Sequence, residues 1–372
     1  MPSRLALIRS ARSLAFKFAN KSGVSGAIAS SRWRQQRLLV LCYHGISQDD
    51  EHEWGQTLYI SPERLEQRLE QLRKLKAAVL PLDQAVDALY AGDLPPLAVS
   101  LTFDDGACDF SLKAVPILAA AQMHSTLYLT TYYTRKDMPV FMPFVSYVLW
   151  KGRGRTVLLP GINIRATIPA DREQPEFLRI HKALLDYAAA AGMNADEKND
   201  FARQISIATG ADFDDLCQRR VLHLMNPAEV RALDPKLVSI QMHTHRHRTP
   251  ASMDELRDEL DRNAAEIVNL SGRSDVAHHF CYPSGVYSSE FVGWLREYGV
   301  KSATTCVRHY STPSTSRLEI PRFLDTMADS ADTFEAWVSG SAALALALRN
   351  EQVAEQVRTP LGFLCSTSFF GY

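Results

Sequence analysis

Short apolar runs recur along this chain of 372 residues, and several of them end at glycine or at a polar cluster. The run LAVSLTF (97–103) follows a Pro-Pro pair and leads directly into two adjacent carboxylates, Asp104 and Asp105, and then Gly106. An apolar run of this length between turn residues is typical of a buried parallel strand. Because ligands bind at the carboxyl ends of such strands, the two aspartates lie where a functional site is expected.

The same pattern continues on both sides of this strand. Apolar runs predict further strands at 38–43, 79–82, 125–131, 237–242, 279–282, 301–306 and 317–323. Caps and apolar residues at helical spacing predict helices at 61–75, 83–92, 112–121, 252–272 and 291–298. Strands that alternate with helices indicate a parallel α/β architecture.

The alternation is interrupted between about 133 and 235. This block is predicted to hold a β-hairpin at 156–168 and helices at about 174–191, 195–207 and 226–233. We interpret residues 133–235 as an insertion or cap that could contact substrate. The predicted order along the chain is a basic arm, a catalytic domain that contains this block, and a helical tail (1–36, 37–328 and 329–372).

Composition narrows the function and the compartment. The chain is 46% hydrophobic and 22% charged with a formal net charge of −1, so nothing in its overall charge points to a nucleic-acid partner. Its six cysteines have no CxxC spacing, which favours reduced thiols over a disulfide framework. The longest apolar run near the amino terminus, 5–8, is too short for a signal peptide, and no segment is apolar for long enough to span a bilayer. We therefore expect a cytoplasmic protein.

The amino-terminal arm is strongly basic. No acidic residue precedes Asp49, whereas eight cationic residues do: Arg4, Arg9, Arg12, Lys17, Lys21, Arg32, Arg34 and Arg37. This pattern fits a basic amphipathic helix on an anionic membrane surface, so residues 1–36 could hold the protein peripherally at the inner membrane face. It fits a solvated arm without a partner equally well.

Histidines gather at a second strand end. His243, His245 and His247 follow the predicted strand at 237–242. One carboxylate and two imidazoles can hold a divalent metal and leave positions open for water and substrate, as hydrolytic sites do. His243 and His247 would meet on one helical turn or from a tight loop, and His245 would then point elsewhere. Six other histidines are expected to be ordinary buried or surface residues: His124, His181, His223, His278, His279 and His309.

The sequence Asp-Asp-Gly also occurs in other kinds of structure and site. Adjacent aspartates are common in solvated turns and helix caps. A phosphoryl-transfer site of the haloacid dehalogenase type requires Asp-x-Asp, whereas here the two aspartates are neighbours. The acidic pocket of a response regulator would leave the histidine cluster unexplained. A metal-dependent hydrolase accounts for both clusters.

Three motifs carry a family resemblance. TFDDG (102–106), HTHRH (243–247) and CYPSG (281–285) resemble, in this order, the first motifs of the polysaccharide deacetylases, which are carbohydrate esterase family four or NodB-homology domains. CYH (42–44) and LEIPR (318–322) are similar to the branch that acts on exopolysaccharides such as poly-N-acetylglucosamine. The resemblance implies a distorted (β/α) barrel, and metal-dependent removal of N-acetyl groups from an N-acetylhexosamine-containing polysaccharide or its precursor.

The resemblance also assigns roles by position. It implies that Asp105, His243 and His247 bind the metal, with zinc expected. It implies that Asp104 is the general base that activates water, and that the backbone N–H of Ser284 stabilises the oxyanion. These roles suit the chemistry, because a metal activates water and a neighbouring carboxylate can accept the proton.

This chain departs from the family pattern at several places. Many members carry an arginine that pairs with the base where this chain has Cys281, and Arg322 could supply that charge from the last predicted strand. The late Leu-His motif that supplies a general acid elsewhere is not visible. We hypothesise that His44 protonates the leaving amine, with a buried histidine bonded to backbone as the alternative. A carbohydrate O-acetyl esterase and a catalytically silent glycan-binding module remain the alternative functions.

Overall fold

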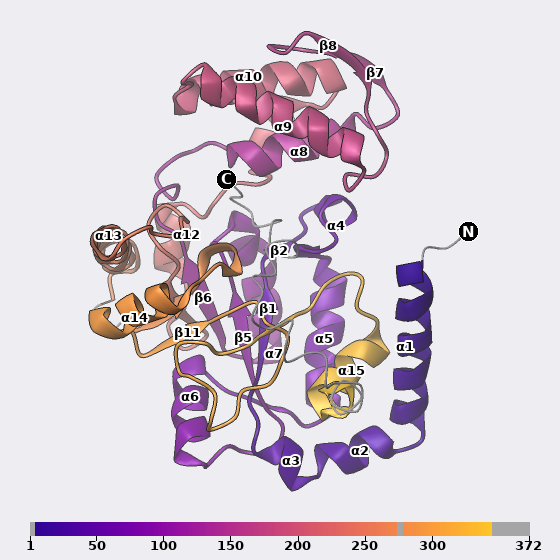
Figure 1. Ribbon diagram of the computed structural model, residues 1–372, viewed down its shortest axis with the longest axis vertical. Helices are drawn as coiled ribbons and strands as arrows, with labels where there is room; N and C mark the ends of the chain where they lie inside the picture. The colour runs from indigo at the N-terminus through magenta and orange to yellow at the C-terminus, as the bar shows by residue number, and fades with distance from the viewer. Residues whose placement is uncertain (1–3, 274–277, 344–372) are drawn as a thin grey trace.

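The computed structural model describes residues 4–273 and 278–343, and its centre is a parallel sheet that curls into a half-barrel (Figure 1). Along the sheet the strands are β11 (Ser302–Thr304), β10 (His279–Cys281), β9 (Val238–Met242), β6 (Ser125–Leu129), β5 (Ala98–Phe103), β1 (Leu39–Tyr43) and β12 (Phe323–Leu324), and β4 (Ala78–Val79) also pairs with β5. The predicted parallel α/β class is confirmed. Every strand predicted outside the 156–168 hairpin overlaps a strand of this sheet, the last of them only at Phe323.

The predicted alternation of strands and helices is confirmed by α5 (Pro62–Lys74), α6 (Leu82–Ala91), α7 (Val115–Ala121), α13 (Met253–Ser271) and α14 (Ser289–Tyr298). The chain outside the cap also forms α4 (Glu51–Trp54), where a loop was predicted, the π-helical turn η1 (Phe110–Ala114), α12 (Pro227–Ala232), the 3₁₀ turn η2 (Pro283–Gly285) and α15 (Ala331–Ser339). The short strands β2 (Gly45–Ile46) and β3 (Tyr59–Ile60) form a separate pair. Of the predicted tail, residues 344–372 lie outside the described residues.

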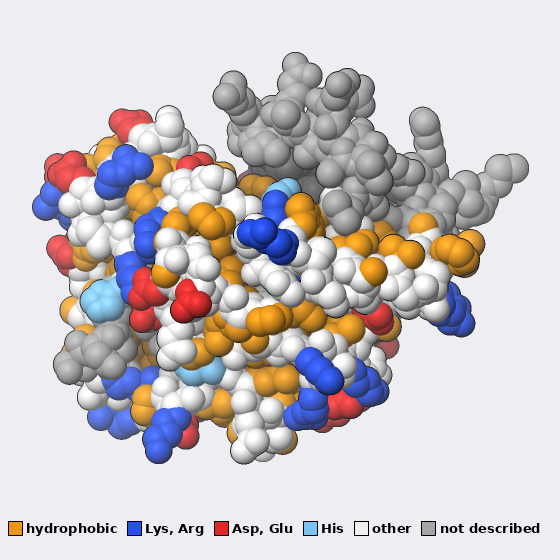
Figure 2. Space-filling model, turned by 90° about the horizontal axis from the view of Figure 1, so that it is seen from below, with side chains coloured by type: hydrophobic (Ala, Val, Ile, Leu, Met, Phe, Trp, Pro, Cys, Tyr) orange, Lys and Arg blue, Asp and Glu red, His pale blue; other side chains and the backbone are white. Residues whose placement is uncertain are grey.

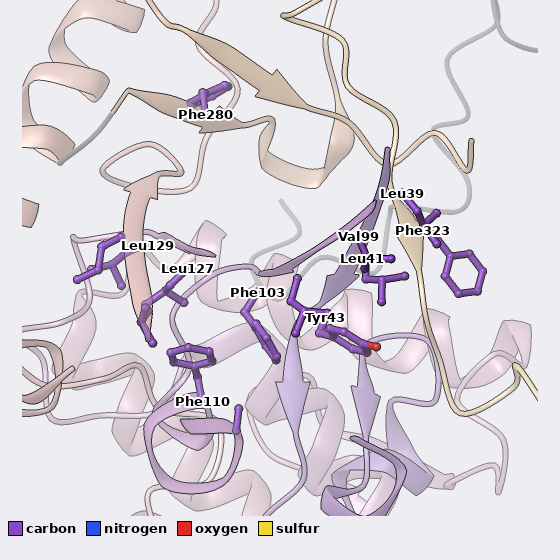
Figure 3. Packing of buried hydrophobic residues seen from close by; sticks show 14 of the residues in the cluster. Leu39, Leu41, Tyr43, Val99, Phe103, Phe110, Leu127, Leu129, Phe280 and Phe323 are labelled. Carbon is purple, nitrogen blue, oxygen red and sulfur yellow. The ribbon is translucent and has the colours of Figure 1, made fainter. Parts of the chain in front are cut away.

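The strands are buried on both faces. Along β1, Leu39 and Leu41 pack into the large cluster between the sheet and its outer helices, together with Phe103 and Phe323 (Figure 3). Val40, on the opposite face of β1, packs into a second cluster with residues of α6. Burial of both faces explains why these strands are continuous apolar runs in the sequence, without polar alternation.

The prediction of the last strand is wrong over most of its length. The sequence predicts a strand over 317–323, but only β12 at its end pairs with β1. Before β12 the chain crosses from β11 to β1 and makes a single parallel bridge, between Ile320 and Thr304. Pro321 has no N–H to give to a ladder, so a regular strand cannot continue through it. This crossing closes the gap between the two edges of the sheet and carries Arg322.

A cap rises from the sheet between β6 and β9, on the side of the carboxyl ends of the strands (Figure 1). It consists of α8 (Phe141–Lys151), the antiparallel hairpin β7 (Thr156–Leu159) and β8 (Ile164–Thr167), α9 (Pro175–Ala190), α10 (Ala195–Thr209) and α11 (Phe213–Gln218). The hairpin and the helices α9 and α10 are as predicted. Helix α8 was missed because FMPFVSYVLWK is apolar on all sides and so shows no helical period.

The amino-terminal segment is helical and tied to the body. It forms α1 (Arg4–Lys21), α2 (Val24–Ala29) and α3 (Arg32–Gln35), and α1 lies alongside α15 (Figure 1). Phe16 is buried, and the fully buried Arg34 donates to the carbonyl of Val338 at 2.8 Å. The expectation of a solvated arm without a partner is therefore wrong for the described part of this segment.

A buried ion pair joins α5 to the chain after β12. Arg68 donates through Nε and Nη2 to the two carboxylate oxygens of Asp325, at 2.8 and 3.0 Å. The Tyr43 hydroxyl donates to the same carboxylate at 3.2 Å. Burial raises the pKa of Asp325 to about 6 although Arg68 lies beside it.

The Arg68→Met variant is expected to lose about 3 kcal/mol of unfolding free energy, because it leaves the Asp325 carboxylate buried without its cation. Urea unfolding followed by circular dichroism measures this loss. Arg73→Met removes an exposed pair with Glu70 on the same helix and should change the value by less than about 0.5 kcal/mol. Equal losses of unfolding free energy in the two variants would show that the buried pair stabilises the protein no more than the exposed pair does.

Candidate active site

Asp105, His243 and His247 converge at the carboxyl ends of β5 and β9. The Nε2 atoms of His243 and His247 lie 3.1 and 3.2 Å from the same oxygen of Asp105, Oδ1. All three side chains are almost fully buried, and one ligand atom from each lies within 4.8 Å of the others. The structure thus brings together the three residues that the sequence assigns to a metal.

The donor chemistry of this group calls for a cation. The Nδ1 atom of His243 donates its proton to the Cys281 carbonyl at 2.8 Å, so Nε2 is the nitrogen of this ring that can bind a cation. The second oxygen of Asp105, Oδ2, is buried and has no hydrogen-bond partner within 4–273 and 278–343. A buried carboxylate needs a positive charge beside it, which either a proton on an imidazole or a metal ion can supply. Two imidazoles and one carboxylate therefore fit a divalent metal such as zinc.

Local backbone conformation aims these side chains. Asp105 has a φ of 72°, and Thr244 and His247 have φ values of 60° and 56°. Positive φ is uncommon in residues with a Cβ and is often found at functional sites. Of the two arrangements that the sequence allowed for His243 and His247, the structure has the tight loop. His245 points elsewhere, as expected, and its Nδ1 lies 2.9 Å from the hydroxyl of Thr131.

Asn263 on α13 holds this loop, and the sequence analysis missed it. Its side-chain oxygen accepts from the backbone N–H of His243 at 3.0 Å, and its amide nitrogen donates to the Leu129 carbonyl at 2.9 Å. The signal was available, because Asn263 interrupts the apolar stripe of its helix between Leu260 and Ile267. A fully buried amide in such a stripe must have polar partners.

The Asp104 carboxylate forms a two-point ion pair with Arg322. The guanidinium donates through Nη1 to Oδ1 and through Nη2 to Oδ2, both at 2.7 Å. Burial alone would raise the pKa of Asp104, but the charge and hydrogen bonds of Arg322 outweigh it and lower that pKa to about 2. Asp104 is therefore ionised at neutral pH. The expectation that Arg322 replaces the missing motif arginine is confirmed.

Two thiols complete the surroundings of Asp104. The Sγ atoms of Cys42 and Cys281 lie 3.6 and 3.5 Å from Asp104 Oδ2, and Arg322 Nη2 lies 3.1 Å from Cys281 Sγ. Burial raises the pKa of both thiols, so they remain protonated weak donors. A cysteine in an apolar strand is usually an ordinary core residue, so the sequence analysis assigned no role at the site to Cys42.

His44 and Ser284 lie at the same edge of the sheet. His44 directly follows β1, and its Nε2 lies 3.7 Å from Asp104 Oδ2, whereas its Nδ1 has no hydrogen-bond partner in the described part of the chain. The backbone bond expected for an ordinary buried histidine is therefore not seen at Nδ1. Ser284 lies in the turn η2 after β10, with a φ of 55°. The oxyanion role of its N–H stays a prediction.

A family comparison agrees with this fold and site. Residues 191–303, which include HTHRH and CYPSG, match the model of the polysaccharide deacetylase family. The resemblance that the sequence motifs suggest is thereby confirmed, and the fold is the (β/α) barrel of that class, here a curled half-barrel. Over residues 191–303 the chain is thus similar to polysaccharide deacetylases of the NodB type, which are hydrolases.

Two solved structures share the fold. The deacetylase PplD of Streptococcus pyogenes, solved in complex with acetate, is 16% identical, with 80% of this chain and 96% of that chain covered and a TM-score of 0.52. IcaB from Ammonifex degensii is also 16% identical, with 82% of this chain and 97% of that chain covered and a TM-score of 0.50. No curated protein sequence matches the chain.

The Arg322→Met variant is expected to lose at least about 100-fold in deacetylation rate with the metal content of wild type, because it releases Asp104 and leaves Asp105, His243 and His247 in place. Acetate release and metal content per chain measure the two effects separately. The Arg322→Lys variant keeps the charge without the two-point contact and should fall between wild type and Arg322→Met. A full rate in Arg322→Met would contradict the importance of this pair.

Proposed function

We propose that this protein is a metal-dependent N-deacetylase that hydrolyses the acetamido groups of an N-acetylhexosamine-containing polysaccharide or its precursor. One observation carries the proposal. Two adjacent carboxylates have different partners: Asp105 faces two histidines, and Asp104 faces an arginine. A metal site beside a separate ionised carboxylate is what amide hydrolysis needs.

Asp105, His243 and His247 would hold the metal, which we expect to be zinc. When bound, the metal would lower the pKa of a water molecule and polarise the acetyl carbonyl. The Nδ1 contact of His243 with the Cys281 carbonyl fixes the ring and leaves Nε2 available for this purpose.

The other residues would move protons and stabilise charge. Asp104 would accept a proton from the attacking water, whose oxygen forms a bond to the acetyl carbon. The Ser284 N–H would donate a hydrogen bond to the negative oxygen that develops on that carbon. His44 would give a proton to the amine nitrogen as the carbon–nitrogen bond breaks. The products are acetate and a free amino sugar.

An aromatic side chain near the site supports a sugar substrate. Tyr132 follows β6 and remains 38% exposed, and its ring meets that of His245 edge to face. The backbone N–H of Tyr132 donates to the His245 carbonyl at 2.8 Å, so Tyr132 lies beside the loop that carries His243 and His247. Exposed aromatic rings with a few polar neighbours are typical of ligand sites.

The central test combines metal content with acetate release in wild type, Asp104→Asn and His243→Ala. Wild type should bind about one metal per chain and release acetate from N-acetylglucosamine oligomers. Asp104→Asn should keep the metal and lose at least about 100-fold in rate, since an amide cannot accept the proton. His243→Ala should lose both the metal and the activity.

Two outcomes would contradict the proposal. Faster acetate release from O-acetylated than from N-acetylated oligomers would indicate an esterase on the same fold. Glycan binding with neither metal nor acetate release in wild type would indicate a silent binding module. The Leu158→Gln variant, which changes an exposed residue of the cap hairpin, serves as a control and should match wild type.

The His44→Ala variant tests the proton donor. It should bind metal normally but release acetate at least about 10-fold more slowly, because the leaving amine no longer receives a proton. A synthetic N-acyl substrate whose leaving amine is a weak base needs less protonation and should narrow the difference. Full turnover in His44→Ala on the natural type of substrate would exclude this role.

A further inference from the structure

The outer face of α1 exposes large apolar side chains. Leu14 and Phe18, one helical turn apart, are 68% and 74% exposed. Phe16, between them in sequence, is only 4% exposed and belongs to the main core. Side chains on opposite sides of one helix thus differ sharply in burial, and Leu14 and Phe18 lie on the outer side.

This orientation is fixed by contacts along the inner face. Ser13 Oγ lies 3.1 Å from Ser330 Oγ, and the Asn20 side chain donates to the Asp332 carbonyl at 3.2 Å. Both partners lie at the start of α15. Because these bonds hold α1 in place, Leu14 and Phe18 cannot turn inward to become buried.

Positive charge accompanies the exposed apolar residues. Lys17 and Lys21 are exposed on the same helix, and no acidic residue occurs before Asp49 although the whole chain has a net charge of −1. The apolar exposure continues into α2, where Val24 is 49% exposed. On the face of the molecule that includes α2 and α3, hydrophobic side chains reach the surface among Lys and Arg (Figure 2).

We propose that Leu14, Phe18, Lys17 and Lys21 form a contact surface for an anionic lipid bilayer. The two apolar side chains would enter the interface, and the two ammonium groups would meet lipid phosphates. The charge decides against a second copy of the chain, because a symmetric contact would place these lysines opposite one another. None of the described helices is long and apolar enough to cross a membrane, so the contact is peripheral. This inference does not depend on the proposed reaction.

The test is co-sedimentation of the full chain with vesicles. Wild type should bind vesicles of phosphatidylglycerol and phosphatidylcholine but not vesicles of phosphatidylcholine alone, and added salt should weaken the binding. Leu14→Gln with Phe18→Gln should lower binding at least about 10-fold, and Lys17→Gln with Lys21→Gln should do so as well. Glutamine is uncharged and favours helices, so these variants separate the apolar from the charged contribution.

Ile207→Gln is the matched control, because Ile207 is 71% exposed on α10 of the cap and should not affect binding. Thermal unfolding of each variant confirms that α1 still packs. Deletion of the whole segment is unsuitable, since it would remove the buried Arg34. Equal binding by the Leu14/Phe18 variant, or no binding by wild type, would overturn the proposal. So would a wild-type dimer that dissociates in this variant, which would identify a contact between copies.

Discussion

The bidentate pair between Arg322 and Asp104 is the interaction on which the site depends. A carboxylate inside a barrel is costly unless a cation and hydrogen bonds compensate it, and Arg322 supplies both. The guanidinium also donates from Nε to the Thr305 carbonyl at 3.0 Å and from Nη1 to the Thr102 hydroxyl at 3.2 Å. It therefore joins the chain after β11 to the end of β5, across the place where the sheet would otherwise be open.

The end of β5 explains how two neighbouring aspartates acquire different environments. Asp104 still follows the strand, and its N–H donates to the Tyr43 carbonyl of β1 at 2.9 Å. Asp105 leaves it with a φ of 72°, and Gly106 follows with a φ of 89°. A φ of 89° favours glycine at 106, and a Cβ there would also lie 2.3 Å from Leu129 Cδ1, so the Leu129 side chain would have to shift.

Apolar runs made the strands and the meeting of Asp105 with His243 and His247 predictable, because a parallel sheet brings its carboxyl ends to one edge. Contacts between segments that lie far apart in the sequence were harder to predict. Asn263 acts through backbone groups of two other strands, and α8 is buried on all sides, so neither produces the polar pattern of a surface helix. The contact of Arg322 could be proposed only because a family position lacked its arginine. The irregular crossing that delivers it depends on Pro321, whose effect on the strand was overlooked.

Space and charge explain why this chain has Cys281 where many deacetylases have an arginine. Cys281 Sγ lies 3.1 Å from Arg322 Nη2 and 3.5 Å from Asp104 Oδ2, so the thiol fills the pocket beside the pair. An arginine at 281 would bring a second guanidinium onto the same carboxylate, where the two cations would repel at short range. A small, neutral side chain at 281 is therefore compatible with an arginine at 322, whereas a second arginine at 281 is not. The Cys281 carbonyl meanwhile accepts from His243, so the same residue links the surroundings of the proposed base to the metal-binding histidine.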